Sequence, residues 1–169
     1  MKKIKPPNPK RRLQVAIVAG VAIVASVIAV SYYLDQANLK GQRFGDNLAL
    51  IQLDLKNETA DFDGKLTMYE KGQIPRDQMV NITDSHIAKM ENILTRYDTL
   101  DAPESFVPSL QLFRLSTQTQ LESDNALKQW VLTGDNATRA KSDQLLQQSF
   151  QYEINALASY NNAKSGNSQ

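Results

Sequence analysis

The stretch LQVAIVAGVAIVASVIAVSYYL, residues 13–34, decides the fold expected for this chain, because none of its side chains is charged. As an α-helix rising about 1.5 Å per residue, this stretch would be about 33 Å long. The hydrocarbon core of a bilayer is roughly 30 Å thick, so a helix of this length can cross it with a slight tilt. The sequence therefore predicts a transmembrane helix at residues 13–34.

The charges on the two sides of this stretch differ. Six of the 19 Lys and Arg residues precede it, in residues 1–12, whereas residues 35–169 hold the other 13 and all 18 Asp and Glu residues. The net charge of +1 is thus the sum of a +6 tail and a −5 remainder. Because Lys and Arg accumulate on the cytoplasmic side of a span, we expect a single-pass protein of the cell membrane with a cytoplasmic N-terminus and the remainder outside.

A cleaved secretory signal is the competing interpretation of the apolar stretch, since Ala29 and Ser31 offer a cleavage site before Tyr32. The apolar region of a secretory signal usually has about 7 to 15 residues, and this one is longer, so an uncleaved signal-anchor is favoured. Tyr32 and Tyr33 would then lie at the outer membrane interface, where tyrosine is enriched, and act as interface anchors.

Small side chains recur on one side of the predicted transmembrane helix, at Ala16, Ala19, Ala22, Ser26 and Ala29. Small residues allow membrane helices to approach each other closely. This packing seam would suit contact with a second copy or with another subunit. The alternative is that alanine simply fills a membrane anchor.

The rest of the chain has helical periodicity and no strand-like alternation. Its composition, with 41% hydrophobic residues, 7 Gly and no Cys, excludes collagen-like, disulfide-stapled and wholly disordered classes. Apolar residues at helical spacing predict four helices, at residues 35–62, 75–97, 104–132 and 136–161. The expected inward residues are Phe44, Leu48, Ile51, Leu55 and Phe62 in the first helix, Met79, Ile82, His86, Met90, Ile93 and Tyr97 in the second, Phe106, Leu110, Phe113, Leu121, Leu127, Trp130 and Val131 in the third, and Ala140, Leu146, Phe150, Ile154, Leu157 and Tyr160 in the fourth.

Turn residues separate these four helices. We expect Asp63 and Gly64 to end the first, Pro75 to begin the second and Gly134 to end the third. Short connections favour an up-and-down bundle with coiled-coil-like packing. The expected fold is therefore all-α, with one N-terminal transmembrane helix followed by an extracytoplasmic antiparallel four-helix bundle. The expected parts are a cytoplasmic basic tail at residues 1–12, the transmembrane helix at 13–34, the bundle at 35–162 and a flexible tail at 163–169.

The sequence contains no motif for catalysis or for binding a cofactor. The one histidine, His86, and the lack of cysteine exclude a metal site built from several His or Cys ligands. His86 lies in an apolar stripe, which favours a buried structural histidine over a ligand or general base. Thr83 stands where a di-iron bundle would have the Glu of Glu-x-x-His. We expect no catalytic, cofactor-binding or metal-binding residue, no cofactor and no enzyme activity.

Three asparagines, Asn57, Asn81 and Asn136, begin N-x-[ST] sequons on the predicted outward side and are candidate glycosylation sites. Asn136 lies in a predicted turn and is the most credible acceptor, whereas Asn81 lies beside core positions of a helix. The outward part is net acidic, which opposes contacts with phosphate, so we expect no nucleic-acid partner.

Two functions fit these features. The first is a membrane-anchored interaction or structural protein, an accessory subunit of a membrane or cell-surface complex, whose partners are the lipid bilayer and other membrane or surface proteins or a second copy. The second is an extracytoplasmic bundle that binds a small ligand and signals through a partner. For this second function, the expected bundle is similar in architecture to the four-helix ectodomains of chemoreceptors. Chemoreceptors also have a second membrane span and a cytoplasmic signalling region, and these 169 residues contain neither.

Overall fold

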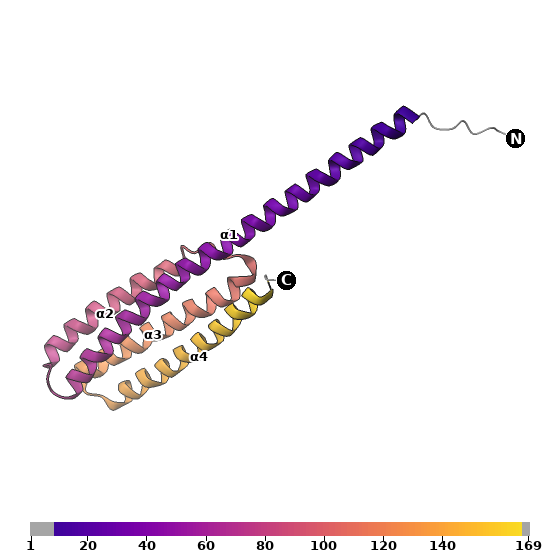
Figure 1. Ribbon diagram of the computed structural model, residues 1–169. Coiled ribbons are helices and arrows are strands. Elements are labelled where there is room, and N and C mark those ends of the chain that lie inside the picture. Colours follow the sequence, from indigo (N-terminus) through magenta and orange to yellow (C-terminus); the bar gives the residue numbers. More distant parts are fainter. Residues whose placement is uncertain (1–8, 167–169) are drawn as a thin grey trace. The chain divides into compact units, whose positions relative to one another are not determined.

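The computed structural model describes the backbone of residues 9–166 and the side chains of residues 39–166. The described residues form helices and no strand: α1 (Pro9–Glu70), α2 (Arg76–Tyr97), the short 3-10 helix η1 (Glu104–Phe106), α3 (Val107–Thr133) and α4 (Asn136–Gly166) (Figure 1). The chain divides into two compact units, Met1–Lys40 and Gly41–Gln169. For the described residues, the predicted all-α class is therefore confirmed, and the four α-helices are consistent with the predicted helical bundle.

The predicted transmembrane span, residues 13–34, lies outside the residues whose side chains are described. The same holds for its packing seam and its interface tyrosines, namely Ala16, Ala19, Ala22, Ser26, Ala29, Tyr32 and Tyr33. Within the described part of the chain, no helix combines the length and the hydrophobicity that crossing a bilayer requires.

Side-chain contacts show how the helices in the unit Gly41–Gln169 run relative to one another. Asp54 on α1 pairs with Arg96 on α2, and Glu58, further along α1, pairs with Lys89, which comes earlier on α2. The two helices are therefore antiparallel. The contacts that give the same result for the next two helix pairs are Tyr97 with Thr117, His86 with Asp124, Ser116 with Ser149, and Ser123 with Ser142. Successive helices thus reverse direction and pack as a helical bundle (Figure 1).

The first helix of the bundle is longer than the sequence predicted. The expected turn at Asp63 and Gly64 is wrong, because α1 continues through both residues to Glu70. A glycine inside a helix costs about 1 kcal/mol relative to alanine, and favourable packing of neighbouring residues can offset this cost. Leu66 and Tyr69, which follow the glycine, pack against a buried apolar cluster, and this packing keeps the chain helical.

The turn between α1 and α2 is built on Gly72, whose φ of 71° is left-handed. Its amide donates to the carbonyl of Tyr69 at 2.8 Å, and the amide of Gln73 donates to the carbonyl of Met68 at 2.9 Å. These two bonds form a Schellman motif, which satisfies the last carbonyls of α1. Pro75 then occupies the N-cap position of α2, close to the predicted start of this helix, and its carbonyl accepts a hydrogen bond from the amide of Met79 at 3.0 Å.

The turn between α3 and α4 follows the prediction. Gly134 has a φ of 72°, and its amide donates to the carbonyl of Trp130 at 2.7 Å. The Asp135 carboxylate then accepts a hydrogen bond from the amide of Ala137 at 3.0 Å and caps the first turn of α4. α4 continues to Gly166, beyond the predicted end of the fourth helix.

Two apolar clusters fill the interior of the bundle. One contains Phe44, Leu48, Ile51, Leu55, Met90, Ile93, Tyr97, Phe106, Phe113 and Ala156, and the other contains Phe62, Ile74, Met79, Leu127 and Val131. All five residues expected to face inward from the first helix are buried. In the second helix the same is true of every expected residue except Ile82, which is half-buried.

The predicted inward face of α4 is wrong. Phe150, Ile154 and Leu157 were expected in the core, but their side chains are 49%, 59% and 48% exposed. Ser142, Ser149 and Ala156, spaced seven residues apart, are buried instead. They face a matching series on α3, Ser109, Ser116 and Ser123, and the hydroxyls of Ser116 and Ser123 donate to α4 carbonyls at 2.9 and 2.8 Å. Small side chains let the two helices pack closely, which turns the large apolar residues of α4 outward.

Candidate functional site

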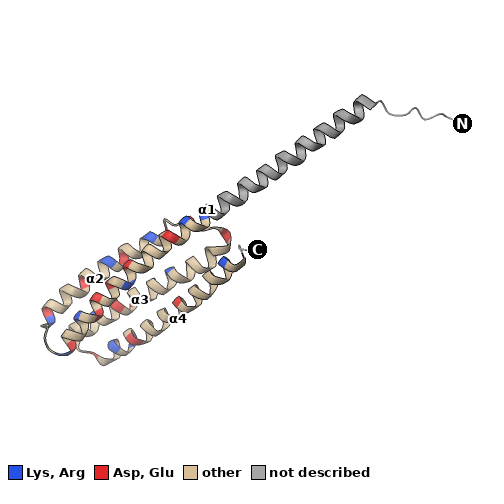
Figure 2. Cartoon of the chain, in the orientation of Figure 1, with Lys and Arg blue, Asp and Glu red and all other residues tan. Residues whose placement is uncertain are grey.

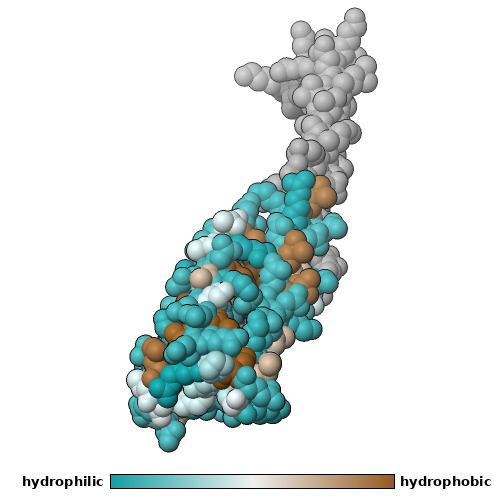
Figure 3. All heavy atoms as spheres, turned by 90° about the vertical axis from the view of Figure 1, so that its left-hand side faces the viewer, coloured by the Kyte–Doolittle hydropathy of each residue, from teal (hydrophilic) through white to brown (hydrophobic). Residues whose placement is uncertain are grey.

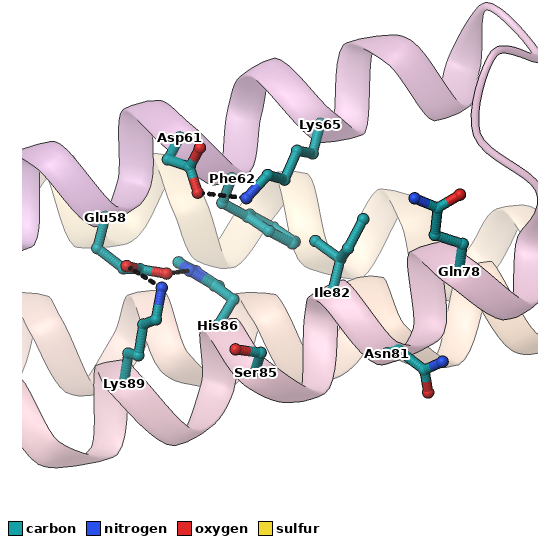
Figure 4. Close-up of a pocket in the computed structure, with 10 residues that line it drawn as sticks. All are labelled: Glu58, Asp61, Phe62, Lys65, Gln78, Asn81, Ile82, Ser85, His86 and Lys89. Carbon is teal, nitrogen blue, oxygen red and sulfur yellow. Dashed lines mark hydrogen bonds and ion pairs between the residues drawn. The ribbon is translucent and has the colours of Figure 1, made fainter.

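The most unusual group in the core is His86, which lies on α2 between α1 and α3 and is 2% exposed. Its Nδ1 is 3.1 Å from Oε1 of Glu58 on α1, and its Nε2 is 3.2 Å from Oδ2 of Asp124 on α3. The Phe62 ring stacks on the imidazole, with 4.0 Å between ring centroids and 2° between ring planes. Both ring nitrogens therefore face carboxylate oxygens, and Figure 4 shows the Glu58 side of this cluster.

Helical spacing places these groups together. His86 belongs to the buried stripe of α2, three residues after Thr83 and four before Met90. Glu58 and Phe62 are four residues apart on α1, so they share the face that points toward α2. We call Glu58, His86 and Asp124 the histidine cluster.

The ion pairs around the histidine cluster balance its charge. Oε2 of Glu58 accepts a hydrogen bond from Nζ of Lys89 at 2.9 Å. A protonated His86 and Lys89 together neutralise the carboxylates of Glu58 and Asp124. Charged groups buried in this way need partners, and among the described residues no buried side-chain nitrogen or oxygen is left without a hydrogen bond.

The carboxylates favour the protonated form of the imidazole. Burial is the largest single influence on His86 and lowers its pKa, but the hydrogen bonds and charges of Asp124 and Glu58 together outweigh burial. The net result is that the pKa of His86 is raised above its ordinary value. In the same region, partial burial and then the charge of Asp124 raise the pKa of Asp63.

A cavity of about 230 Å³ lies between α1 and α2, next to the histidine cluster. Its apolar part is formed by Phe62 and Ile82, and charged side chains surround it (Figure 4). Of the charged groups, Lys65 is bound to Asp61, and this hydrogen bond is the main reason that the pKa of Asp61 is lowered. The cavity can hold a small polar group. No described cluster of three His, Asp or Glu side chains is arranged to hold a metal ion.

The three sequon asparagines lie on the surface of the bundle. Asn57 on α1 and Asn81 on α2 are exposed and border the space between these two helices. Asn81 lies between Val80 and Ile82, which are half-buried, and its own side chain is exposed. Asn136 is the first residue of α4 and is also exposed.

Sequence reasoning identified His86 as buried but missed its partners. Glu58 and Asp124 come from two other helices, 28 and 38 residues away, and neither belongs to a recognisable motif. The available signal was a histidine within an apolar stripe, which calls for polar partners on the facing helices. In comparisons with known proteins, no family model, no curated protein and no solved structure matches this chain.

Proposed function

We propose that this chain is a single-pass protein of the cell membrane whose extracytoplasmic antiparallel four-helix bundle binds other membrane or surface proteins, or a second copy of itself, as an accessory subunit of a complex. The uncharged residues 13–34 and the six basic residues before them support the anchor and its orientation. The small-residue seam of that segment supports contact with another subunit within the bilayer.

The outer face of α4 is the observation that carries this proposal. Phe150, Ile154 and Leu157 follow each other at spacings of four and three residues, so they lie on one side of the helix. Each is about half exposed, although a helix in a bundle normally turns its large apolar residues inward. Apolar side chains grouped in this way are typical of a surface that a protein partner covers. We call these three residues the α4 face.

The charge around the α4 face supports the same function. Between Asp143 and Lys164, the only charged residue of α4 is Glu153. Charged side chains are more frequent along α1 and α2 (Figure 2), and the view in Figure 3 shows a largely hydrophilic surface with separate hydrophobic side chains. The centres of protein interfaces are depleted in charged residues, so α4 suits an interface better than α1 or α2 does.

Glycans fit this division of the surface. Asn57 and Asn81 lie on α1 and α2, where they border the space between these two helices. On an extracytoplasmic bundle, glycans at these two positions would cover the charged side, and a glycan at Asn136 would lie at the start of α4, fourteen residues before Phe150.

The experiment is crosslinking and purification of the tagged full chain from its own membranes. The variant Phe150→Ser, Ile154→Ser, Leu157→Ser should lose the crosslinked partner while keeping its melting temperature. Leu115→Ser is the matched control, because Leu115 is an exposed apolar residue on α3 (37%). A partner retained by the triple variant, or a wild-type chain recovered only as a monomer, would contradict the proposal.

The cavity beside the histidine cluster favours a second candidate function, the binding of a small ligand by a sensor-like bundle. Its rim offers the carboxylate of Asp61 and the ammonium groups of Lys65 and Lys89 to a polar molecule. A ligand that binds only the folded chain raises the melting temperature in a dose-dependent way. Screening with small metabolites tests this function, with Lys89→Ala expected to abolish the shift and Lys56→Ala, an exposed lysine that does not line the cavity, as the control.

A further inference from the structure

The histidine cluster joins three helices through one side chain. His86 is on α2, Glu58 is on α1 and Asp124 is on α3, so this one side chain makes contacts with both neighbouring helices. We propose that His86 is a pH-sensitive latch: the protonated ring holds α2 to α1 and α3, and loss of its proton releases one of these contacts and loosens the bundle around the cavity.

The hydrogen-bonding capacity of the groups leads to this proposal. An ionised carboxylate only accepts hydrogen bonds, and a neutral imidazole donates from only one of its two nitrogens. His86 has a carboxylate oxygen within 3.2 Å of each nitrogen, so both contacts are hydrogen bonds only when both nitrogens carry a proton. When one proton is lost to water, one nitrogen presents its lone pair to a carboxylate, and that contact becomes repulsive.

The proton has a route to solvent on the α1 side. The side chain of Glu58 is 14% exposed and that of Asp124 is 8% exposed. The cavity between α1 and α2 is lined by both Glu58 and His86, so water in it reaches the Nδ1 side of the ring. Water in the cavity can therefore exchange a proton with the ring from the α1 side.

The charged surroundings also favour the protonated ring. The charged groups that face or adjoin the ring are Glu58, Asp61, Asp63 and Lys65 from α1, Lys89 from α2 and Asp124 from α3. Four of these are acidic and two are basic. The Phe62 ring stacked on the imidazole adds an attraction to the cationic form. Loss of the proton therefore removes the charge attraction to both carboxylates and to the aromatic ring, together with one of the two hydrogen bonds.

The test is an NMR titration of the full chain, with its histidine ring labelled and the protein held in detergent micelles. The chain has one histidine, so one signal reports the latch. We expect the titration midpoint of the wild type to lie above about 6.5, the ordinary value for histidine. In parallel, the backbone amides of α2 should exchange hydrogen faster above this midpoint than below it, after correction for the intrinsic pH dependence of exchange.

Two variants separate a latch from a merely structural histidine. Asp124→Asn and Glu58→Gln each replace a carboxylate by an amide, whose NH₂ group can donate to a neutral ring. Each should lower the midpoint, Asp124→Asn by about one unit, which is a tenfold loss of proton affinity. Each should also flatten the dependence of the melting temperature on pH. Asp98→Asn removes an exposed partner of Arg114 and is the matched control, with no expected change in the midpoint.

A wild-type midpoint at or below about 6.5 would overturn the proposal, because the two carboxylates would then fail to outweigh the burial that lowers the pKa of His86. A midpoint that neither amide variant changes would overturn it as well. The wild-type titration needs no substitution, and Glu58→Gln changes the more exposed carboxylate, so the proposal stays testable if Asp124→Asn fails to fold.

Discussion

Replacing His86 by alanine should destabilise the bundle strongly, and by an amount that depends on pH. The substitution leaves Glu58 and Asp124 without their shared partner and removes the ring stacked on Phe62. Removing one member of a buried ion pair costs about 3 to 5 kcal/mol. We expect the lower end, about 3 kcal/mol, because Lys89 still neutralises Glu58, whose side chain is partly exposed.

This loss of free energy translates into a measurable shift in melting temperature. For a bundle of this size, 1 kcal/mol corresponds to about 3 °C, so the variant should melt about 9 °C below the wild type near pH 6. The pKa of His86 is raised in the folded chain, so its stabilisation is complete below about pH 6.5 and is lost as the pH rises through the folded-state pKa. The difference between the two proteins should therefore shrink toward pH 9.

Thermal unfolding followed by circular dichroism at pH 6, 7, 8 and 9 measures both effects. Lys128→Ala is the control, since Lys128 pairs with Asp84 on the surface and such a pair contributes about 1 kcal/mol or less. If His86→Ala costs no more than Lys128→Ala near pH 6, or costs the same at every pH, the stabilising role assigned to the protonated ring is wrong.

Three further substitutions test the packing of the bundle. Ser149→Leu should destabilise it by about 1 to 3 kcal/mol in urea unfolding, because Ser149 is 1% exposed at the close contact with α3, whereas Gln144→Leu on the exposed side of α4 should not. Tyr97→Phe should cost about 1 to 3 kcal/mol, because it removes the hydroxyl that bonds Gln52 at 2.7 Å and Thr117 at 2.9 Å. Burial raises the pKa of Tyr97 to about 12. The free energy of unfolding of the wild type should therefore fall between about pH 10 and about pH 12, as the hydroxyl ionises. An ultraviolet titration of tyrosine ionisation should lose its last phase in Tyr97→Phe. Gly72→Ala should lower the free energy of unfolding by about 1 to 2 kcal/mol, because Gly72 has a left-handed φ. Gly64→Ala should raise the free energy of unfolding by about 0.5 to 1 kcal/mol, because Gly64 lies in open space within α1. The opposite order of these two effects would refute the assignment of the turn.

The sequence predicted the parts of the fold that depend on local pattern. The apolar stripe from Phe44 to Phe62 is buried, and Gly134 ends α3 in the left-handed conformation. Both features follow from periodicity and from the backbone freedom of glycine. Asp63 and Gly64 predict a turn that does not form, because the packing of Leu66 and Tyr69, which follow them, keeps the chain helical.

The inward face of α4 was not predictable from hydrophobicity alone. A stripe of large apolar residues normally marks the core, but in α4 Phe150, Ile154 and Leu157 are exposed. The buried face of α4 is formed by serine and alanine residues spaced seven apart. The matching spacing of Ser109, Ser116 and Ser123 on α3 was present in the sequence and would have indicated a closely packed helix pair. The histidine cluster, in contrast, depends on the register of three helices, which no single segment encodes.

The most direct test of the proposed function is photo-crosslinking in native membranes with a photoreactive residue placed at Ile154 or, as a control, at Leu115. Both positions are exposed, but only Ile154 lies on the α4 face. We expect one discrete crosslinked product from Ile154, absent from Leu115 and lost when Phe150→Ser is added. No product from Ile154, or the same products from both positions, would contradict an interface on α4.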